Sequence, residues 1–119
     1  MDFTNILETA VLAASDKKGR DIKAVKIDEL TTVADYFLFV TATSTTHVRA
    51  LADEIEEKLS EAGVEPHHIE GKSTGWILLD YTGVVVHIFT PSEREFYGLD
   101  RMWDNGEEVD VSKICGEEG

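Results

Sequence analysis

Residues 76–89 read WILLDYTGVVVHIF, which is two apolar runs separated by Thr82 and Gly83. Each run has the length of a β-strand, and a two-residue connection that contains glycine indicates a hairpin, although less strongly than Asn-Gly does. With these two residues as the loop, the register pairs Asp80 with Val85, Leu78 with His87, and Trp76 with Phe89. The sequence therefore predicts an antiparallel hairpin with a fixed register.

The alternation of side chains along each strand sorts this hairpin into two faces. One face is aliphatic except for one tyrosine, and we expect it to pack against helices: Ile77, Leu79, Tyr81, Val84, Val86 and Ile88. The other face mixes apolar and polar side chains, which is typical of a protein-binding patch: Trp76, Leu78, Asp80, Val85, His87 and Phe89. A second interpretation stays open, in which another helix covers this face and Asp80 pairs with His87.

The segments before the hairpin alternate between helical and extended patterns. They predict a helix over residues 4–17 capped by Thr4, strands within 21–30 and 35–42, a helix over 44–63, and an edge strand within 64–70. Residues 35–42 are apolar nearly throughout, which is typical of a central strand covered on both faces. We therefore predict an α/β fold, with a single domain built on a mixed sheet with flanking helices.

The segment after the hairpin divides into a helix and a tail. Ser92 and Glu95 stand in the relation of a capping box, which predicts a last helix that runs to about Trp103. The residues that follow are rich in acids and weakly periodic, so we expect much of this segment to be a mobile tail. The predicted organisation is one domain over residues 1–104 and an acidic tail over residues 105–119.

The charge of the chain restricts its partners. Its 24 acidic residues exceed its 11 lysines and arginines, which gives a formal net charge of −13. Such a surface repels phosphate backbones and attracts basic proteins, so we expect little direct contact with nucleic acid. A second interpretation is that the charge simply keeps the protein in solution. The single cysteine, the absence of a membrane-length apolar run and an N-terminus unlike a signal peptide favour the cytoplasm.

The sequence lacks the patterns that carry catalysis or bind cofactors. Its four histidines show no metal-ligand spacing, and no nucleophile-elbow, phosphate-loop or dinucleotide motif occurs. An apolar strand, the small-residue turn TATS (41–44) and a helix give a layout faintly like that of nucleotidyltransferases. Those enzymes need paired carboxylates to hold metal ions, whereas Asp80 is the only acid within a strong downstream strand. We therefore predict no enzymatic activity, no metal and no cofactor.

Three segments of the chain resemble the ribosomal silencing factor family, also called Iojap-like proteins: residues 21–44, 70–89 and 94–103. The similarity rests on a combination that is specific to this family: Asp35-Tyr36-Phe37, Glu70-Gly71, Trp76 with Asp80, His87 with Phe89, and Arg94, Tyr97 and Trp103. The chain departs from the family pattern at Ala42, where a glycine is usual, and at residues 99–103. Residues after Trp103 are not part of the pattern that carries this resemblance.

The resemblance implies a fold related to nucleotidyltransferases without their catalytic carboxylates. It also implies binding to the fourteenth protein of the large ribosomal subunit, a block on joining of the small subunit when nutrients are scarce, and a homodimer in the free state. The expected contact residues are Trp76, Leu78, Asp80, His87 and Phe89, with Lys72, Arg94 and Tyr97 as weaker candidates. The alternatives are an assembly factor for the large subunit that uses the same surface, as organellar members are, and a nucleotidyltransferase-type enzyme.

Overall fold

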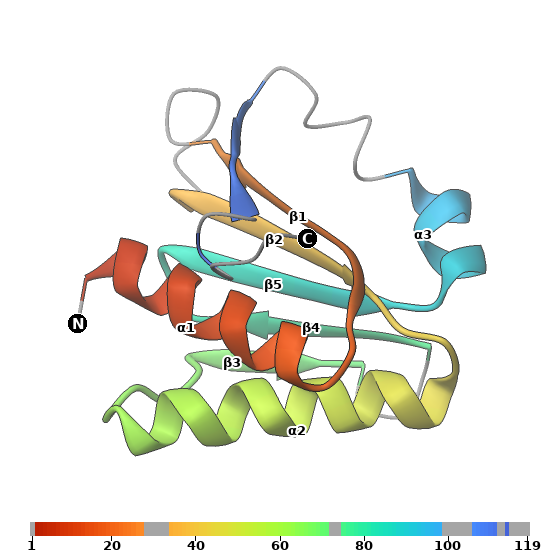
Figure 1. The fold of residues 1–119 in the computed structure, drawn as a ribbon, viewed down its shortest axis with the longest axis horizontal. Coiled ribbons are helices and arrows are strands. Elements are labelled where there is room, and N and C mark those ends of the chain that lie inside the picture. Colours follow the sequence, from red (N-terminus) through yellow and green to blue (C-terminus); the bar gives the residue numbers. More distant parts are fainter. Residues whose placement is uncertain (1, 28–33, 72–74, 99–105, 112–113, 115–119) are drawn as a thin grey trace.

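Alternating helices and strands build one mixed sheet with two helices on one of its faces (Figure 1). The computed structural model describes residues 2–27, 34–71, 75–98, 106–111 and 114. Within these residues the elements are α1 (Phe3–Asp16), β1 (Arg20–Lys26), β2 (Tyr36–Thr41), α2 (Thr45–Glu61), β3 (His68–Glu70), β4 (Trp76–Asp80), β5 (Val84–Phe89), α3 (Pro91–Tyr97) and β6 (Glu107–Val109). None of the described helices is long and apolar enough to cross a membrane.

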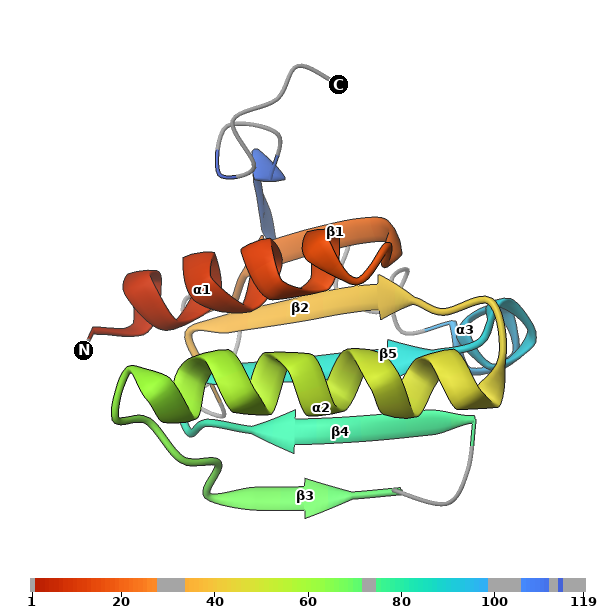
Figure 2. The same cartoon turned by 60° about the horizontal axis from the view of Figure 1, so that its bottom comes forward.

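The sheet has six strands in the order β3-β4-β5-β2-β1-β6. The two central strands, β2 and β5, are parallel, and the other neighbours are antiparallel. Helices α1 and α2 lie side by side on one face, as Figure 2 shows from the helix side. The predicted α/β fold, a mixed sheet with flanking helices, is therefore confirmed.

The hairpin of β4 and β5 has the predicted register. Trp76 lies opposite Phe89, Leu78 opposite His87 and Asp80 opposite Val85. Thr82 adopts a φ of 73°, in the left-handed region that few residues other than glycine occupy. Its backbone N–H donates to Oδ1 of Asp80 at 2.8 Å, so this carboxylate holds the turn in place.

The sheet face toward the helices forms the main core. The aliphatic residues of the hairpin, Ile77, Leu79, Val84, Val86 and Ile88, are all buried against the helices, as predicted. The apolar stripe of α2 is buried from Val48 to Leu59, whereas Ala62 at the end of this helix is exposed. Burial of each large aliphatic side chain contributes about 1.5–3 kcal/mol, so this layer dominates the stability of the fold.

The helix ends differ in part from the predictions. Oδ1 of Asp2 accepts from the N–H of Asn5 at 2.8 Å, so the N-cap of α1 is Asp2 and the prediction of Thr4 is wrong. Ser44 caps α2, because its Oγ accepts from the N–H of His47 at 3.1 Å. Helix α3 begins at Pro91 without a capping box and ends at Tyr97, because Gly98 turns into the left-handed conformation at φ 60°. The predicted continuation toward Trp103 is therefore wrong for residue 98, and residues 99–105 lie outside the described part of the chain.

Part of the predicted tail belongs to the sheet. Glu107–Val109 form β6 and pair antiparallel with β1, with Val109 opposite Ala24 and Glu107 opposite Lys26. Gly106 comes so close to β1 that an added Cβ would overlap Cγ1 of Val25 and lie 2.9 Å from the carbonyl oxygen of Lys26. The expectation of an irregular tail is wrong for these residues, because pairing with β1 supplies order that local sequence does not encode.

Candidate protein-docking face of the sheet

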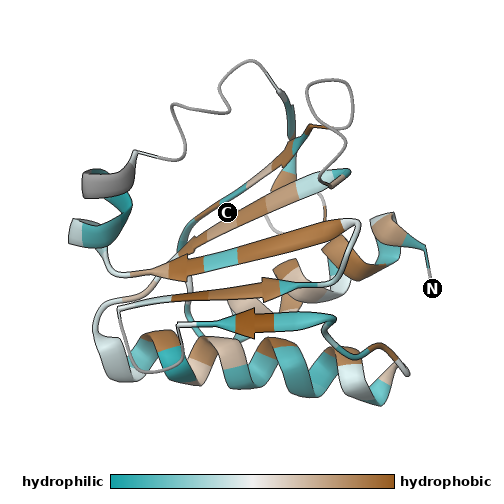
Figure 3. Ribbon diagram, turned by 180° about the vertical axis from the view of Figure 1, so that it is seen from behind, coloured by the Kyte–Doolittle hydropathy of each residue, from teal (hydrophilic) through white to brown (hydrophobic). Residues whose placement is uncertain are grey.

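The sheet face opposite α1 and α2, here called the docking face, is apolar across several strands. Figure 3 shows this side, with the strands in front of the two helices and hydrophobic residues running across β1, β2, β4 and β5. Its buried residues form a second cluster, against which Trp76 and Leu78 pack: Val25, Ile27, Ala34, Phe37, Phe39, Val85 and Phe89. The sheet is therefore apolar on both faces, although the two long helices cover one of them.

His87 lies in the middle of an aromatic group on the docking face. Its ring centroid is 5.1 Å from that of Phe37 and 5.4 Å from that of Phe39. Nε1–H of Trp76 donates to Nδ1 of His87 at 3.3 Å, which ties the indole to the strand beside it. The carboxylate of Asp80 instead accepts from the turn at Thr82. The interpretation in which Asp80 pairs with His87 is therefore wrong.

Burial separates the five predicted contact residues of the hairpin into two groups. Trp76, Leu78 and Asp80, all on β4, are half-buried and so retain accessible surface. His87 is 5% exposed and Phe89 is 0% exposed, because both lie on the central strand β5. The first group is accessible from outside, whereas the second belongs to the packed layer beneath it. The prediction that His87 and Phe89 face outward as contacts does not match this burial.

The pairing of β3 with β4 adds two polar residues to this face. His68 lies opposite Asp80 and Glu70 lies opposite Leu78, so all four side chains share one side of the sheet. Nε2 of His68 lies 2.6 Å from Oε2 of Glu70, and both side chains are exposed. His68 and Glu70 could not be predicted as contact candidates from the sequence, because only the register between β3 and β4 places them beside the apolar residues. They form a polar rim at the edge of the face.

The weaker contact candidates lie elsewhere or have other roles. Nη1 of Arg94 donates to the carbonyl oxygen of Asp21 at 2.8 Å and to Oγ1 of Thr41 at 2.6 Å. Its guanidinium also lies 5.9 Å from the ring centroid of Phe39 and 5.6 Å from that of Phe89. These contacts make Arg94 the residue that attaches α3 to the end of the sheet. Tyr97 is the last residue of α3, and Lys72 lies outside the described residues.

The accessible side chains of the docking face are of the kinds that bind another protein. Its accessible part consists of the indole of Trp76, the isobutyl group of Leu78 and a few polar groups at the rim. Within the part of the chain that the structure describes, no three His, Cys, Asp or Glu side chains gather in a way that would hold a metal ion. An aromatic anchor above a rigid layer, with a polar edge, is the arrangement found at the centres of protein interfaces.

Comparisons with known proteins show the family to which the chain belongs. The family model for the ribosomal silencing factor during starvation matches residues 1–118. The ribosomal silencing factor of Bacillus subtilis is 36% identical over 112 residues, which cover 93% of this chain and 95% of that protein. The chloroplastic protein Iojap of Zea mays is 29% identical over 99 residues, 83% of this chain and 43% of that protein.

A solved structure has the same fold. The crystal structure of a protein from Chromobacterium violaceum superposes with a TM-score of 0.85 at 33% sequence identity, covering 92% of each chain. The family match extends to residue 118, so residues after Trp103, which carry no part of the resemblance quoted above, lie within the family's span. The chain therefore belongs to the ribosomal silencing factor family, which is related to the Iojap proteins and is not a family of enzymes.

Proposed function

We propose that this protein represses translation by binding the fourteenth protein of the large ribosomal subunit through its docking face. The bound factor occupies the space that the small subunit needs, so that whole ribosomes fail to form when nutrients are limited. This mode of action requires no chemical step. It requires a surface that binds one partner firmly and a body large enough to exclude another.

The observation that supports this proposal is the placement of Trp76 and Leu78. Both are half-buried on β4, on the face that α1 and α2 leave uncovered, and both pack on a fully buried aromatic layer. A tryptophan held rigidly at a surface loses little conformational freedom when it binds, which is why tryptophan is enriched among the residues that dominate binding energy. The face therefore has a preformed anchor.

The charge of the chain supports a basic protein as the partner. A net charge of −13 speeds the encounter with a cationic protein and opposes the approach of ribosomal RNA. The exposed acids at the edges of the sheet, such as Glu70 on β3, give this attraction a place near the docking face. The partner is thus expected to offer an apolar recess surrounded by lysines and arginines.

Truncation of the anchor tests this proposal. We expect Trp76→Ala to weaken binding to purified large subunits by about 2 kcal/mol or more, because the indole fills the centre of the interface. Leu12→Ala is a matched control, since Leu12 is an apolar residue 47% exposed on α1. Co-sedimentation with large subunits measures both variants after circular dichroism has shown that they are folded. Unchanged binding of the folded Trp76→Ala protein would remove the docking face from the proposal.

An assembly role would use the same surface, as the family resemblance implies for organellar members. The two roles differ in their consequences for a cell that lacks the protein. If the protein is a silencing factor, cells that lack it contain mature large subunits but fail to reduce translation on starvation. If the protein is an assembly factor, cells that lack it accumulate incomplete large-subunit precursors during growth. Profiling of subunits and their protein content in such cells separates the two.

A further inference from the structure

A cavity of about 470 Å³ lies where the end of α1 meets the beginning of α2, away from the docking face. Its lining residues come from the C-terminal end of α1, the connection to β1 and the segment that enters α2: Asp16, Lys17, Lys18, Arg20, Thr43 and His47. This volume is in the range of small-molecule sites, which is roughly 300–1,000 Å³. None of these residues takes part in the docking face.

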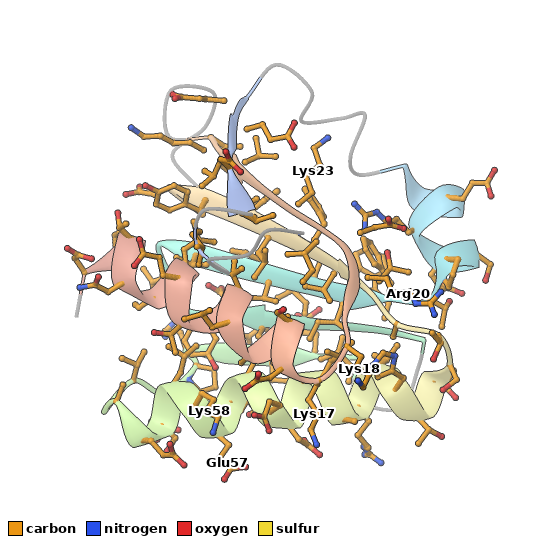
Figure 4. All side chains as sticks on the ribbon, viewed as in Figure 1. Lys17, Lys18, Arg20, Lys23, Glu57 and Lys58 are labelled. Carbon is orange, nitrogen blue, oxygen red and sulfur yellow. The ribbon has the colours of Figure 1, made fainter. Side chains whose placement is uncertain are left out.

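The lining of this cavity is cationic in a chain that is otherwise acidic. Three of the chain's 11 lysines and arginines gather here with a single carboxylate, Asp16, so the lining has a formal charge of +2. Figure 4 shows Lys17, Lys18 and Arg20 around the C-terminal end of α1. None of the three makes an ion pair with another residue that the structure describes. Their charges are therefore available to a ligand.

The backbone that presents these cations is held in place. Nδ1 of His47 accepts from the N–H of Thr43 at 2.9 Å, and Nε2 of His47 lies 2.8 Å from the carbonyl oxygen of Lys17. An added Cβ at Gly19 would lie 2.7 Å from Cγ1 of Val40, so the connection from α1 to β1 lies directly on the core. Lys18 adopts a φ of 65°, a strained conformation that the surrounding contacts maintain.

A helix-dipole role explains only part of this arrangement. Lysines near the end of α1 stabilise the negative end of its dipole, which accounts for Lys17 and Lys18. Arg20 belongs to β1 and contributes nothing to that effect. The beginning of α2, a helix of 17 residues, adds partial positive charge on the opposite wall, beside Thr43. The cavity also borders the carboxyl end of β2, because Thr43 follows that strand closely.

We propose that this cavity binds a small ligand with at least two phosphate groups, of the nucleoside diphosphate class. Electrostatic interactions are screened over about 8 Å at physiological ionic strength, so a ligand in the cavity responds mainly to the charges that line it and to Asp21, which follows Arg20 in the chain. A long polyanion such as RNA would instead extend over the acidic surface and be repelled. The cavity thus favours a compact anion. This proposal does not depend on the function of the docking face.

Titration of the ¹⁵N-labelled protein with ADP, pyrophosphate and adenosine, at about 0.15 M salt, tests this inference. We expect ADP and pyrophosphate to shift the amide signals of Gly19, Arg20 and Thr43, and adenosine to leave them unchanged. Absence of these shifts with both phosphate compounds would overturn the proposal. Tighter binding of a single-stranded RNA oligonucleotide than of ADP would overturn the assignment to a small ligand.

A pair of charge-removing variants separates the cavity from the net charge. We expect Lys17→Gln combined with Arg20→Gln to raise the Kd for ADP about tenfold, because two of the three cations are lost. The matched control is Lys58→Gln combined with Lys26→Gln, which removes the same charge from α2 and from the end of β1. Equal weakening in both proteins would contradict a defined site. The dispersion of the amide spectrum shows for each protein whether the fold is intact.

Discussion

Tyr81 has a buried hydroxyl group on the helix side of the hairpin. The residue is 4% exposed, and its oxygen has no hydrogen-bond partner among the residues that the structure describes. Burial raises the pKa of this hydroxyl above its ordinary value, and the negative charges of Glu56 and Glu65 raise it further. An unsatisfied buried hydroxyl opposes folding by about 1–3 kcal/mol, so this residue reduces the stability of the core.

We predict that Tyr81→Phe leaves the free energy of unfolding unchanged or raises it by about 1 kcal/mol at neutral pH. The sign at high pH follows from the raised pKa. Above about pH 10 the unfolded tyrosine loses its proton while the buried one keeps it, so the wild type loses up to about 1.4 kcal/mol per pH unit relative to the variant. Urea unfolding at pH 8 and about pH 11 measures this difference.

Tyr36→Phe is the matched control for that measurement. The hydroxyl of Tyr36 lies 3.3 Å from Oγ1 of Thr4 in an exposed contact, so its loss lowers stability by no more than about 1 kcal/mol. A marked loss of stability in Tyr81→Phe, larger than that in Tyr36→Phe, would show that the Tyr81 hydroxyl is hydrogen-bonded in solution.

At the scale of elements, the hairpin and the edge strands differ in how far sequence determines them. The hairpin register follows from a two-residue loop and an alternating pattern, both local, and it was predictable for every pair from Trp76–Phe89 to Asp80–Val85. The strands β3 and β6 have only three residues each; β3 pairs with the next strand, β4, and β6 pairs with β1, which is far away in the sequence. Such short strands have little periodicity of their own, so their register could not be predicted.

The same distinction explains the outcome at the candidate site. The mixed composition of one hairpin face was visible in the sequence, and the structure places Trp76, Leu78 and Asp80 there with accessible surface. The burial of His87 and Phe89 depends on the phenylalanines that β2 brings beside β5. The cationic cavity was not predicted, because its residues lie in three segments that only the fold brings together.

Gly106 provides a test of the strand β6. We predict that Gly106→Ala lowers the free energy of unfolding by about 1–3 kcal/mol, because a Cβ overlaps Val25 and approaches the carbonyl oxygen of Lys26 too closely for β6 to pair. The rate of hydrogen exchange at the β1 amides should increase at the same time, because these amides lose their pairing with β6. Gly75→Ala is the control, since the nearest atom to its added Cβ is 3.4 Å away. Equal, small effects of both substitutions would show that β6 is not docked in solution.

At the scale of the whole molecule, the proposed function assigns different roles to the two faces of the sheet. The helix face contains the main core and so maintains the fold, whereas the opposite face carries the anchor Trp76. The chain as a whole has a net charge of −13. The contacts of Trp76 act only at short range, whereas the net charge acts over the Debye length. The charge should therefore govern the association rate constant, and the contacts of Trp76 should govern the dissociation rate constant.

This division predicts a specific salt dependence. Raising the salt concentration from about 0.05 M to 0.5 M should lower the association rate constant for large subunits at least about tenfold, with a much smaller change in the dissociation rate constant. Trp76→Ala should instead raise the dissociation rate constant and leave the salt dependence of association intact. Surface plasmon resonance with immobilised protein measures both constants. An association rate that is insensitive to salt would remove the role assigned to the charge.

In the proposed mechanism, occupation of the large subunit by the docking face keeps the small subunit away. The most direct measurement mixes purified large subunits with the protein, then adds small subunits under conditions that favour joining and separates the products by sedimentation. The wild type and Leu12→Ala should leave the subunits apart, and the folded Trp76→Ala, Leu78→Ala double variant should allow whole ribosomes to form. Whole ribosomes in the presence of saturating wild type, or an equally effective double variant, would contradict the claim.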